Sequence, residues 1–312
     1  MSSPIASPRI AILGGSGFAG RNVRDTLEAT GYTVGVFSRS TGCDLLDLPA
    51  ALEILSGFRP TYIVNCAAIV GSVNYVTDFA ADVIDQNMRI ILNVYKIAQQ
   101  LRDAVVVNPI ANCAYPGVLN TYEERSLWDG PIHPSVLSYG STRRMMWTLA
   151  KCYSDQFGIR SVNLVVPNMY GPFDSTNPNK THALNALIIK FVRAKKAGLA
   201  EIEVWGSGKP IREWLYVKDF AVAVRRVVAA GEALLDPVNI GQNHGHTVIE
   251  LVDTLREIVG YEGRIVYNQR YQDGAPKKVM DDKYFRQRFP DFVFTDIKSG
   301  IAETIAYYQR ML

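Results

Sequence analysis

Short apolar runs alternate with amphipathic stretches over the first half of the chain. The apolar runs predict strands at Arg9–Leu13, Tyr32–Phe37, Tyr62–Ala67, from Val105 onward and at Ser161–Val166. Between them, apolar residues recur every three or four positions and predict helices that extend to Thr30 and cover Asp82–Arg102 and Tyr139–Phe157. Alternating strands and helices are typical of a parallel sheet with helices on both faces. We therefore expect an α/β, Rossmann-like, doubly wound fold.

The pattern changes after Gly171. Pro, Asn and Asp residues cluster at 172–179, a helix is predicted over about Leu184–Ala197, and strand, loop and helix patterns are mixed afterwards. We expect a cofactor-binding domain over residues 1–170 and a smaller α/β substrate-binding region over residues 171–312. Some strands and helices of the second part are expected to interleave with the first.

Composition narrows the class of protein. The 312 residues are 48% hydrophobic and 20% charged, which is ordinary for a globular protein, and a net charge of +3 is too small to predict nucleic-acid binding. No apolar run approaches the roughly 20 residues of a membrane helix, and the polar N-terminal segment lacks the order of a signal peptide. The four cysteines have no metal-type spacing. We expect a cytoplasmic protein with free thiols and no metal site.

Glycines follow the first predicted strand with the spacing Gly14-x-x-Gly17-x-x-Gly20. Between a strand and a helix, such glycines allow a tight turn, close approach of the backbone to a pyrophosphate, and close helix–sheet packing. The helix N-terminus then faces the phosphates. A plain tight turn is the alternative. We interpret the segment as a dinucleotide site, with Ser16 and Phe18 in the same turn among the cofactor contacts.

The second predicted strand ends in Ser38-Arg39-Ser40, without the acidic residue that grips the ribose of NAD. A guanidinium suits the 2′-phosphate of NADP instead, so Arg39 predicts NADP(H). The alternative is a solvated surface arginine. Asp44 lies where related proteins often contact the adenine, and a helix-capping aspartate is the alternative.

Several segments carry a family resemblance. They are Asn65-Cys66-Ala67-Ala68, Gln86-Asn87-Met88, Cys113-x-Tyr115-Pro116, Tyr139-x-x-x-Arg143, Pro167–Pro172, Thr181-His182, Val204-Trp205-Gly206-Ser207-Gly208, Pro210–Asp219 and Asp273–Lys278. Together they resemble the extended short-chain dehydrogenase/reductase family of nucleotide-sugar enzymes, and within it the GDP-L-fucose synthase group. That group consists of NADPH-dependent 3,5-epimerases and 4-reductases of GDP-4-keto-6-deoxy-mannose. The likeness covers nearly the whole chain.

The resemblance implies catalytic roles for three residues. Cys113 and His182 match an acid/base pair that moves protons at sugar carbons 3 and 5, where a 4-keto group acidifies the C–H bonds. Tyr139 matches the proton donor that completes reduction of the ketone. The alternatives are a small buried hydrophobic residue for Cys113, a helix-start residue for His182 and a core tyrosine for Tyr139.

Further contacts are implied with the two ligands. Ala67 is expected at the cofactor. The other expected contacts are with a nucleotide-diphosphate sugar, which the resemblance implies is GDP-linked. They are made by Asn168, Arg212, Lys278 and Trp205, with His182 at the same sugar. A guanidinium fork suits the diphosphate; a solvated lysine and a core tryptophan are the alternatives for the last two.

Two positions depart from the family pattern. Ala111 stands where a Ser or Thr hydroxyl normally binds the substrate carbonyl oxygen, and Arg143 replaces the lysine that holds the nicotinamide ribose. Arg143 keeps a positive charge, which at about 4 Å and an effective dielectric near 20 would lower the pKa of Tyr139 by about three units. Arg144 would point about 100° away around the helix. Asn112 is a substitute donor only if its side chain turns toward the site, which a continuing strand would prevent.

Three functions remain open from the sequence. The first is an epimerase/reductase of GDP-fucose-synthase type. The second is another sugar-nucleotide epimerase or dehydratase, of which a non-reducing epimerase would tolerate the two departures best. The third is a non-catalytic binder of NADP or a sugar nucleotide.

A homodimer is also expected, because extended members of this family usually dimerise through the helices predicted at Asp82–Arg102 and Tyr139–Phe157. The supporting observation is apolar surface on both helices, at Ile91, Tyr95, Met146 and Leu149.

Overall fold

The computed structural model describes residues 7–119, 121–231, 233–271, 273 and 275–312. Its main element is a six-stranded sheet in the order β10-β5-β4-β3-β1-β2, in which every neighbouring pair is parallel. These strands are β1 (Arg9–Leu13), β2 (Thr33–Phe37), β3 (Tyr62–Asn65), β4 (Val105–Ala111), β5 (Ser161–Val166) and β10 (Leu234–Asn239). The α/β, doubly wound class predicted from the sequence is confirmed.

Side chains of the central strands alternate between two apolar cores. Ile10 and Ile12 of β1 belong to one core, together with residues of α1 (Phe18–Glu28) and α7 (Val217–Ala230). Ala11 and Leu13 belong to the other, on the opposite face. That core is covered by α2 (Leu48–Phe58), α4 (Ala80–Leu101) and α5 (Leu137–Phe157). Strands buried on both faces explain the continuous apolar runs in the sequence.

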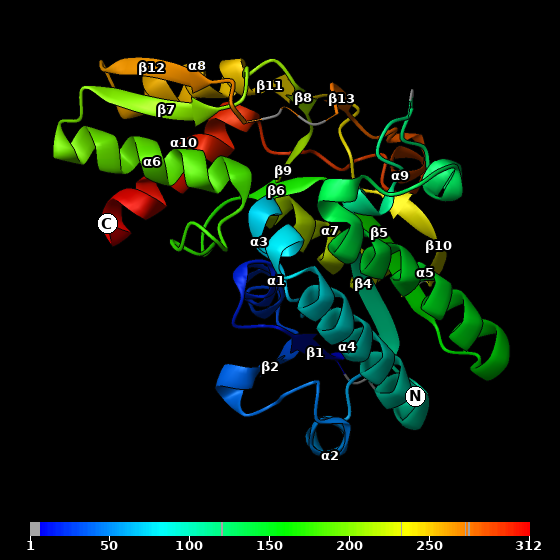
Figure 1. Ribbon diagram of the computed structural model, residues 1–312. Coiled ribbons are helices and arrows are strands. Elements are labelled where there is room, and N and C mark those ends of the chain that lie inside the picture. Colours follow the sequence, from blue (N-terminus) through cyan, green and yellow to red (C-terminus); the bar gives the residue numbers. More distant parts are fainter. Residues whose placement is uncertain (1–6, 120, 232, 272, 274) are drawn as a thin grey trace.

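A smaller region lies beyond the carboxyl ends of the strands, at the top of Figure 1. Its helices are α6 (Ala183–Ala197), α8 (Val248–Val259) and α10 (Ile297–Met311), which share a third apolar core. Its strands form three small sheets: β6 (Asn168–Tyr170) with β9 (Trp214–Tyr216); β7 (Glu201–Trp205) with β12 (Arg264–Asn268); and β8 (Ile211–Arg212) with β11 (His246–Thr247) and β13 (Lys277–Lys278). The two other α-helices of the described chain are short: α3 (Val73–Asp78) and α9 (Lys283–Arg288).

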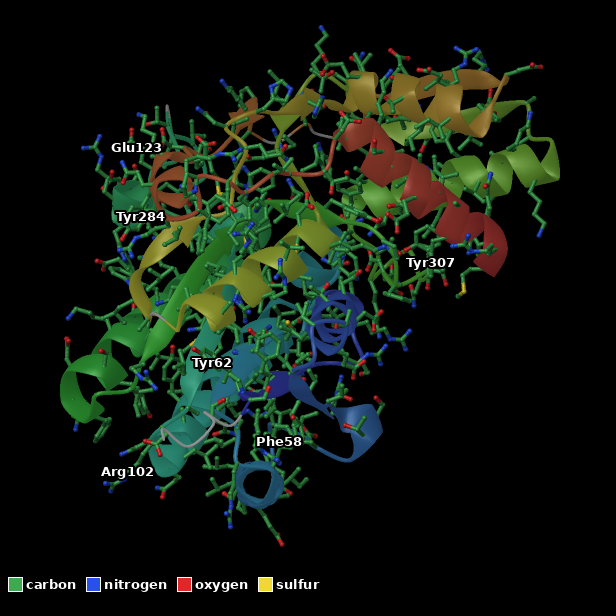
Figure 2. The ribbon with its side chains drawn as sticks, turned by 180° about the vertical axis from the view of Figure 1, so that it is seen from behind. Phe58, Tyr62, Arg102, Glu123, Tyr284 and Tyr307 are labelled. Carbon is green, nitrogen blue, oxygen red and sulfur yellow. The ribbon has the colours of Figure 1, made fainter. Side chains whose placement is uncertain are left out.

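At the opposite edge of the sheet, two connections between a helix and the next strand are tight turns. Phe58 ends α2 before β3, and Arg102 follows α4 before β4; both lie far from the smaller region in Figure 2. Arg59 and Arg102 each adopt φ near 52°, which reverses the chain directly into the next strand. Because the strands are parallel, the loops that follow them all leave from the carboxyl edge, where ligands of open α/β sheets bind.

Three of the four residues offered as apolar surface for a homodimer are buried, and only Leu149 is partly exposed. Ile91, Tyr95 and Met146 are fully buried in the core between their helices and the sheet. The Tyr95 hydroxyl accepts a hydrogen bond from Asn108 at 2.7 Å and lies 3.1 Å from the Ser161 hydroxyl. These side chains pack within the chain, so they provide no apolar surface for a partner.

Among the residues that the structure describes, no helix has the length and apolar character of a membrane span. Within the same residues, no cluster of three or more His, Cys, Asp or Glu side chains is arranged to hold a metal ion. All four cysteines are free thiols, as expected.

Candidate active site

The glycine-rich turn between β1 and α1 leaves no room for side chains. Gly14 has φ +70°, and a Cβ there would lie 2.8 Å from backbone atoms of Ala67 at the end of β3. A Cβ on Gly20 would lie 2.4 Å from the Gly14 carbonyl oxygen. Gly17 is the N-cap of α1, and no side chain caps this helix. The turn therefore brings Gly14 and Ala67 together and leaves first-turn amides of α1 available to an anion.

Arg39, the residue predicted to select NADP(H), lies between Ser38 and Ser40 in the chain, and Ser40 contacts this turn. Arg39 opens a single 3₁₀ turn after β2 and is exposed. Ser40 donates a hydrogen bond to the Ser16 hydroxyl at 3.1 Å, and the Ser38 hydroxyl lies 2.9 Å from that of Ser40. Serine hydroxyls thus lie next to the glycine turn, with Arg39 adjacent to them in the chain. Hydroxyl groups and a guanidinium suit a phosphate monoester.

Asp44 is not a helix cap. Its carboxylate accepts the backbone N–H of Leu46 at 3.0 Å in a local turn. The residue that caps α2 is Asp47, which accepts the N–H of Ala50 at 3.2 Å. The capping alternative considered for Asp44 is therefore wrong, and its contact with the cofactor stays a prediction.

Tyr139 and Arg143 lie on consecutive turns of α5 with their side chains in contact. The guanidinium carbon of Arg143 is 4.8 Å from the centroid of the Tyr139 ring, a cation–π distance. Arg143 is only 2% exposed and donates to the Asn87 side-chain oxygen at 3.1 Å. Burial raises the pKa of Tyr139, and the charge of Arg143 lowers it only partly. Arg143 therefore lowers the pKa of Tyr139, as predicted, but burial raises that pKa by more.

Cys113 lies in the 3₁₀ turn Asn112–Ala114 that follows β4. Burial raises the pKa of its thiol, while the charges of Lys278 and Arg143 oppose that rise. Burial also lowers the pKa of Lys278 to about 8, and the nearby thiol opposes this change. The Lys278 ammonium lies 5.3 Å from the centroid of the Tyr122 ring. Cys113, Tyr139, Arg143 and Lys278 therefore form one electrostatically coupled group, which we call the Cys113 cluster.

The chain bends directly after Ala111, because β4 ends there and the 3₁₀ turn begins. The premise that a continuing strand directs Asn112 away is therefore wrong. Asn112 is 7% exposed, and its side-chain nitrogen is buried without a partner among the described residues. Arg144 donates to the carbonyl oxygens of Ala114 and Gly130 at 2.8 and 3.1 Å. It is therefore no substitute for the missing lysine, as expected.

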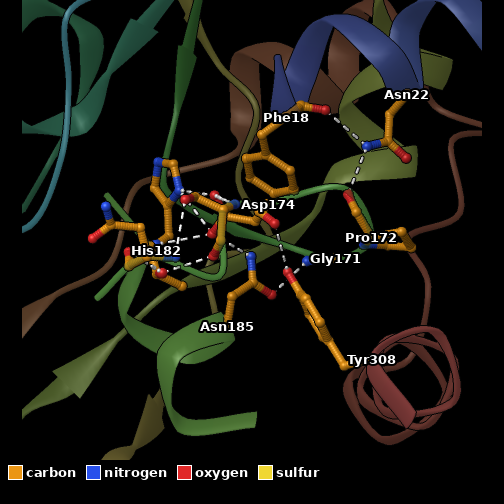
Figure 3. Close-up of polar contacts among 11 residues, drawn as sticks. Phe18, Asn22, Gly171, Pro172, Asp174, His182, Asn185 and Tyr308 are labelled. Atoms are coloured by element: carbon orange, nitrogen blue, oxygen red, sulfur yellow. Dashed lines mark hydrogen bonds and ion pairs between the residues drawn. The ribbon is translucent and has the colours of Figure 1, made fainter. Parts of the chain in front are cut away.

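His182 is the N-cap of α6, and a buried carboxylate holds its ring (Figure 3). Both side-chain oxygens of Asp174 lie 3.1 Å from His182 Nδ1. The His182 ring also packs against Phe18 of α1, with centroids 5.1 Å apart. Because Phe18 follows the glycine turn, His182 borders the predicted cofactor site. No hydrogen bond connects His182 to Cys113 within the described parts of the chain.

The predicted substrate residues lie on the strands of the smaller region. Arg212 and Lys278 are paired in register on β8 and β13, and burial lowers the pKa of Arg212. Asn168 donates to the Glu213 carbonyl oxygen at 3.3 Å. Trp205 is 54% exposed and stacks on Tyr271, with centroids 4.4 Å apart and planes 14° apart. Trp205 is therefore not a core residue.

The sequence analysis assigned no role to three residues that support this site. Asp174 holds His182, and Asn87 accepts from Arg143 while bonding the backbone of Ile69. Glu213 is fully buried and accepts backbone N–H groups of Met280 and Gln242. Burial raises the pKa of Glu213 to about 7. The available signal for Asp174 was its position in the Pro-, Asn- and Asp-rich segment just before His182, where a carboxylate can reach the histidine ring.

The chain is similar to curated proteins over its whole length. It is 30% identical to a protein named probable GDP-L-fucose synthase 1 from Oryza sativa, covering 96% of this chain and 92% of that protein. It is 29% identical to GDP-L-fucose synthase from Escherichia coli K12, covering 97% of both.

Solved structures share the fold. A GDP-L-fucose synthetase from Naegleria fowleri bound to NADP superposes with a TM-score of 0.86 at 23% identity, covering 99% of this chain and 96% of that one. A UDP-glucose 4-epimerase from Thermotoga maritima gives a TM-score of 0.84 at 21% identity, covering 97% and 99%. The model of the NAD dependent epimerase/dehydratase family matches residues 10–241. The chain therefore belongs to the NAD dependent epimerase/dehydratase family.

Proposed function

We propose that this protein is an NADP(H)-dependent enzyme of GDP-L-fucose-synthase type. It would epimerise carbons 3 and 5 of a GDP-linked 4-keto-6-deoxy sugar and reduce carbon 4. Full-length similarity to GDP-L-fucose synthases at 29–30% identity supports the substrate class. The observation that carries the chemistry is the Cys113 cluster, which combines a thiol, a phenol and two cations at the carboxyl edge of the sheet.

Epimerisation needs a base and an acid on opposite faces of the sugar. The 4-keto group acidifies the neighbouring C–H bonds, so one group takes the proton while the C–H electron pair enters the enolate. The other group returns a proton to the opposite face. Cys113 and His182 are the proposed pair. Lys278 and Arg143 favour the thiolate form of Cys113. Lys278 and Arg212 suit the diphosphate of the substrate.

The residues around the glycine turn fit NADP(H). Gly14, Gly17 and Gly20 leave the backbone open where side chains would collide, and the first-turn amides of α1 would hold the pyrophosphate. Arg39 and the hydroxyls of Ser16 and Ser40 would hold the 2′-phosphate. When bound, the cofactor supplies a hydride to carbon 4. Tyr139 would supply the proton to the ketone oxygen.

A non-reducing epimerase is the second candidate, and one observation favours it. Ala111 offers no hydroxyl to the ketone, and the Arg143 guanidinium is occupied by Asn87 and the Tyr139 ring. Reduction must deliver a proton to the ketone oxygen as hydride reaches carbon 4, whereas exchange at carbons 3 and 5 returns the enolate to the ketone and leaves no proton on that oxygen.

The decisive experiment incubates the protein with GDP-4-keto-6-deoxy-mannose in deuterated water, with and without NADPH. Deuterium at carbons 3 and 5 together with NADPH consumption supports the epimerase/reductase. Deuterium without NADPH consumption supports the second candidate. Neither signal, with binding intact by calorimetry, would identify a non-catalytic binder and overturn both.

We propose a cytoplasmic homodimer in which residues 1–170 bind the cofactor and residues 171–312 bind the sugar nucleotide. The second part interleaves with the first, since α7 packs on the main sheet and β10 is its edge strand. A monomer by light scattering at micromolar concentration would exclude the dimer.

A further inference from the structure

We infer that Asp174 is a positioning residue that holds His182 in the tautomer required for proton transfer. The inference rests on the proposed function, in which His182 exchanges a proton with the sugar. Asp174 precedes His182 by eight residues in the loop between β6 and α6. Its two carboxylate oxygens are both 3.1 Å from His182 Nδ1, and one of them accepts the His182 backbone N–H at 2.9 Å.

The carboxylate of Asp174 is itself held from several elements (Figure 3). Asn185 of α6 donates to it at 2.8 Å and uses its own oxygen to accept the N–H of Gly171 at 3.0 Å. Tyr308 of α10 donates to the Asp174 carbonyl oxygen at 3.2 Å. Burial raises the pKa of Asp174, but the hydrogen bonds from His182 and Asn185 hold it below its ordinary value. Asp174 is therefore ionised at neutral pH.

An ionised carboxylate can only accept hydrogen bonds, so its partner Nδ1 must carry the ring proton. In the neutral ring, Nε2 is then the nitrogen without a proton and can accept one from carbon as the C–H bond breaks. The negative charge of Asp174 compensates the imidazolium that forms. Phe18, the uncharged neighbour from α1, packs on the ring at 5.1 Å and restricts its rotation. Asp174 thus fixes both the tautomer and the direction of the ring.

Asp174 also accepts the backbone N–H of His182, the N-cap of α6, and so stabilises the start of that helix. The test must therefore distinguish stabilisation of the helix from positioning of the His182 ring. Asp174→Asn retains one oxygen to accept from the backbone. Its amide group can instead donate to Nδ1, which would force the proton onto Nε2 and leave no acceptor for the sugar. A structural role alone predicts no change of tautomer.

The tautomer is measured by ¹⁵N NMR on histidine-labelled protein, with His182→Gln assigning the signal among the four histidines. We expect the Nδ1–H form in the unmodified protein and the Nε2–H form in Asp174→Asn. Deuterium exchange into the 4-keto substrate should fall by up to about 10⁴-fold in kcat, the loss in a serine protease whose buried aspartate is changed to asparagine and no longer fixes the histidine tautomer. KM should change by only a few-fold. Asp174→Glu should recover part of the rate, and Asp155→Asn on the exposed face of α5 should leave it unchanged.

The outcomes separate this inference from the proposed function. In the His182→Gln background, adding Asp174→Asn should cause no further loss, because the two residues act as one unit. Full exchange activity with an unchanged tautomer in Asp174→Asn would overturn the inference alone. Full activity in His182→Gln would overturn the role of His182 and the inference with it. If Asp174→Asn does not fold, an Nε2–H tautomer in the unmodified protein would still refute the inference.

Discussion

The double substitution Ala111→Ser with Arg143→Lys is expected to raise NADPH-dependent reduction of the ketone while lowering the stability of the fold. Ala111 is the last residue of β4 and pairs in register with Val166 of β5, so the added hydroxyl would sit at the carboxyl edge of the sheet. Lysine at position 143 would remove the guanidinium from the Tyr139 ring and free an ammonium to approach the nicotinamide ribose.

The rate of ketone reduction should rise, whereas the free energy of unfolding should fall. One hydrogen-bond donor to a developing oxyanion contributes about 10²–10³-fold in rate, so a gain on the order of 10²-fold is expected. Losing the charged hydrogen bond from Arg143 to Asn87 costs about 1.5–3 kcal/mol of unfolding free energy. The cost should fall near the lower end, because Asn87 also accepts from the Ile69 N–H at 3.1 Å and is not left without a partner.

The assay follows NADPH consumption under single-turnover conditions, alongside deuterium exchange and urea unfolding. Arg144→Lys is the matched control, since the adjacent arginine bonds Ala114 and Gly130 and lies away from Tyr139. It should lower stability without raising reduction. Exchange should stay within a few-fold in the double variant. A folded double variant that reduces more slowly than the parent would refute the reasoning and make Ala111 and Arg143 adaptations to a different substrate pose.

Three further predictions test other parts of the chain. Calorimetry should show at least tenfold tighter binding of NADP(H) than of NAD(H), and Arg39→Ala should erase most of this gap; equal affinities in the unmodified protein would contradict it. Gly20→Ala should abolish cofactor binding and cost about 1–3 kcal/mol, because its Cβ meets the Gly14 carbonyl at 2.4 Å, whereas Gly57→Ala on α2 has open space and should not destabilise. Lys278→Met should raise stability at pH 7 by about 3 kcal/mol, because a pKa lowered from 10.5 to about 8, at about 1.4 kcal/mol per pKa unit, disfavours the charged lysine in the fold. The pKa of Lys278 is lowered to about 8 in the folded state, so its cost is full below pH 8 and fades as pH rises toward the unfolded value of 10.5. A stability gain that does not shrink across that range would exclude this account.

The sequence predicted the main sheet well because its strands are buried on both faces. Continuous apolar runs at Arg9–Leu13 and Ser161–Val166 coincide with β1 and β5. The helices α4 and α5 begin and end within two residues of their predicted limits, since each has one apolar face against the sheet. The same periodicity could not say whether that face met the sheet or a partner, which is why Ile91 and Met146 were misjudged as surface.

The site was predictable only as separate motifs. Local sequence identified the glycine turn, Tyr139 and His182, but the contacts among them connect residues far apart in the chain. Arg143 meets Asn87 across 56 positions, and the Tyr122 ring meets Lys278 between two different regions. No periodicity encodes such pairings. Asp174 was missed although it lies eight residues from His182, because a loop rich in Asp and Asn offers many carboxylates and amides and only the fold selects one.

The buried arginine has a consequence for how protons reach Tyr139. A guanidinium stays charged at every accessible pH, so Tyr139 always faces a cation, and that cation can be buried because Asn87 and the phenol ring compensate it. A lysine at this position could give up a proton and recover it, but Arg143 cannot. Burial keeps the pKa of Tyr139 raised, so the phenol holds its proton firmly in the resting protein. If Tyr139 gives that proton to the ketone, its replacement must arrive by a route that bypasses Arg143, and Cys113 and Lys278 are the titratable neighbours in the same cluster. The substitution thus links the reductive half of the reaction to the group proposed for epimerisation.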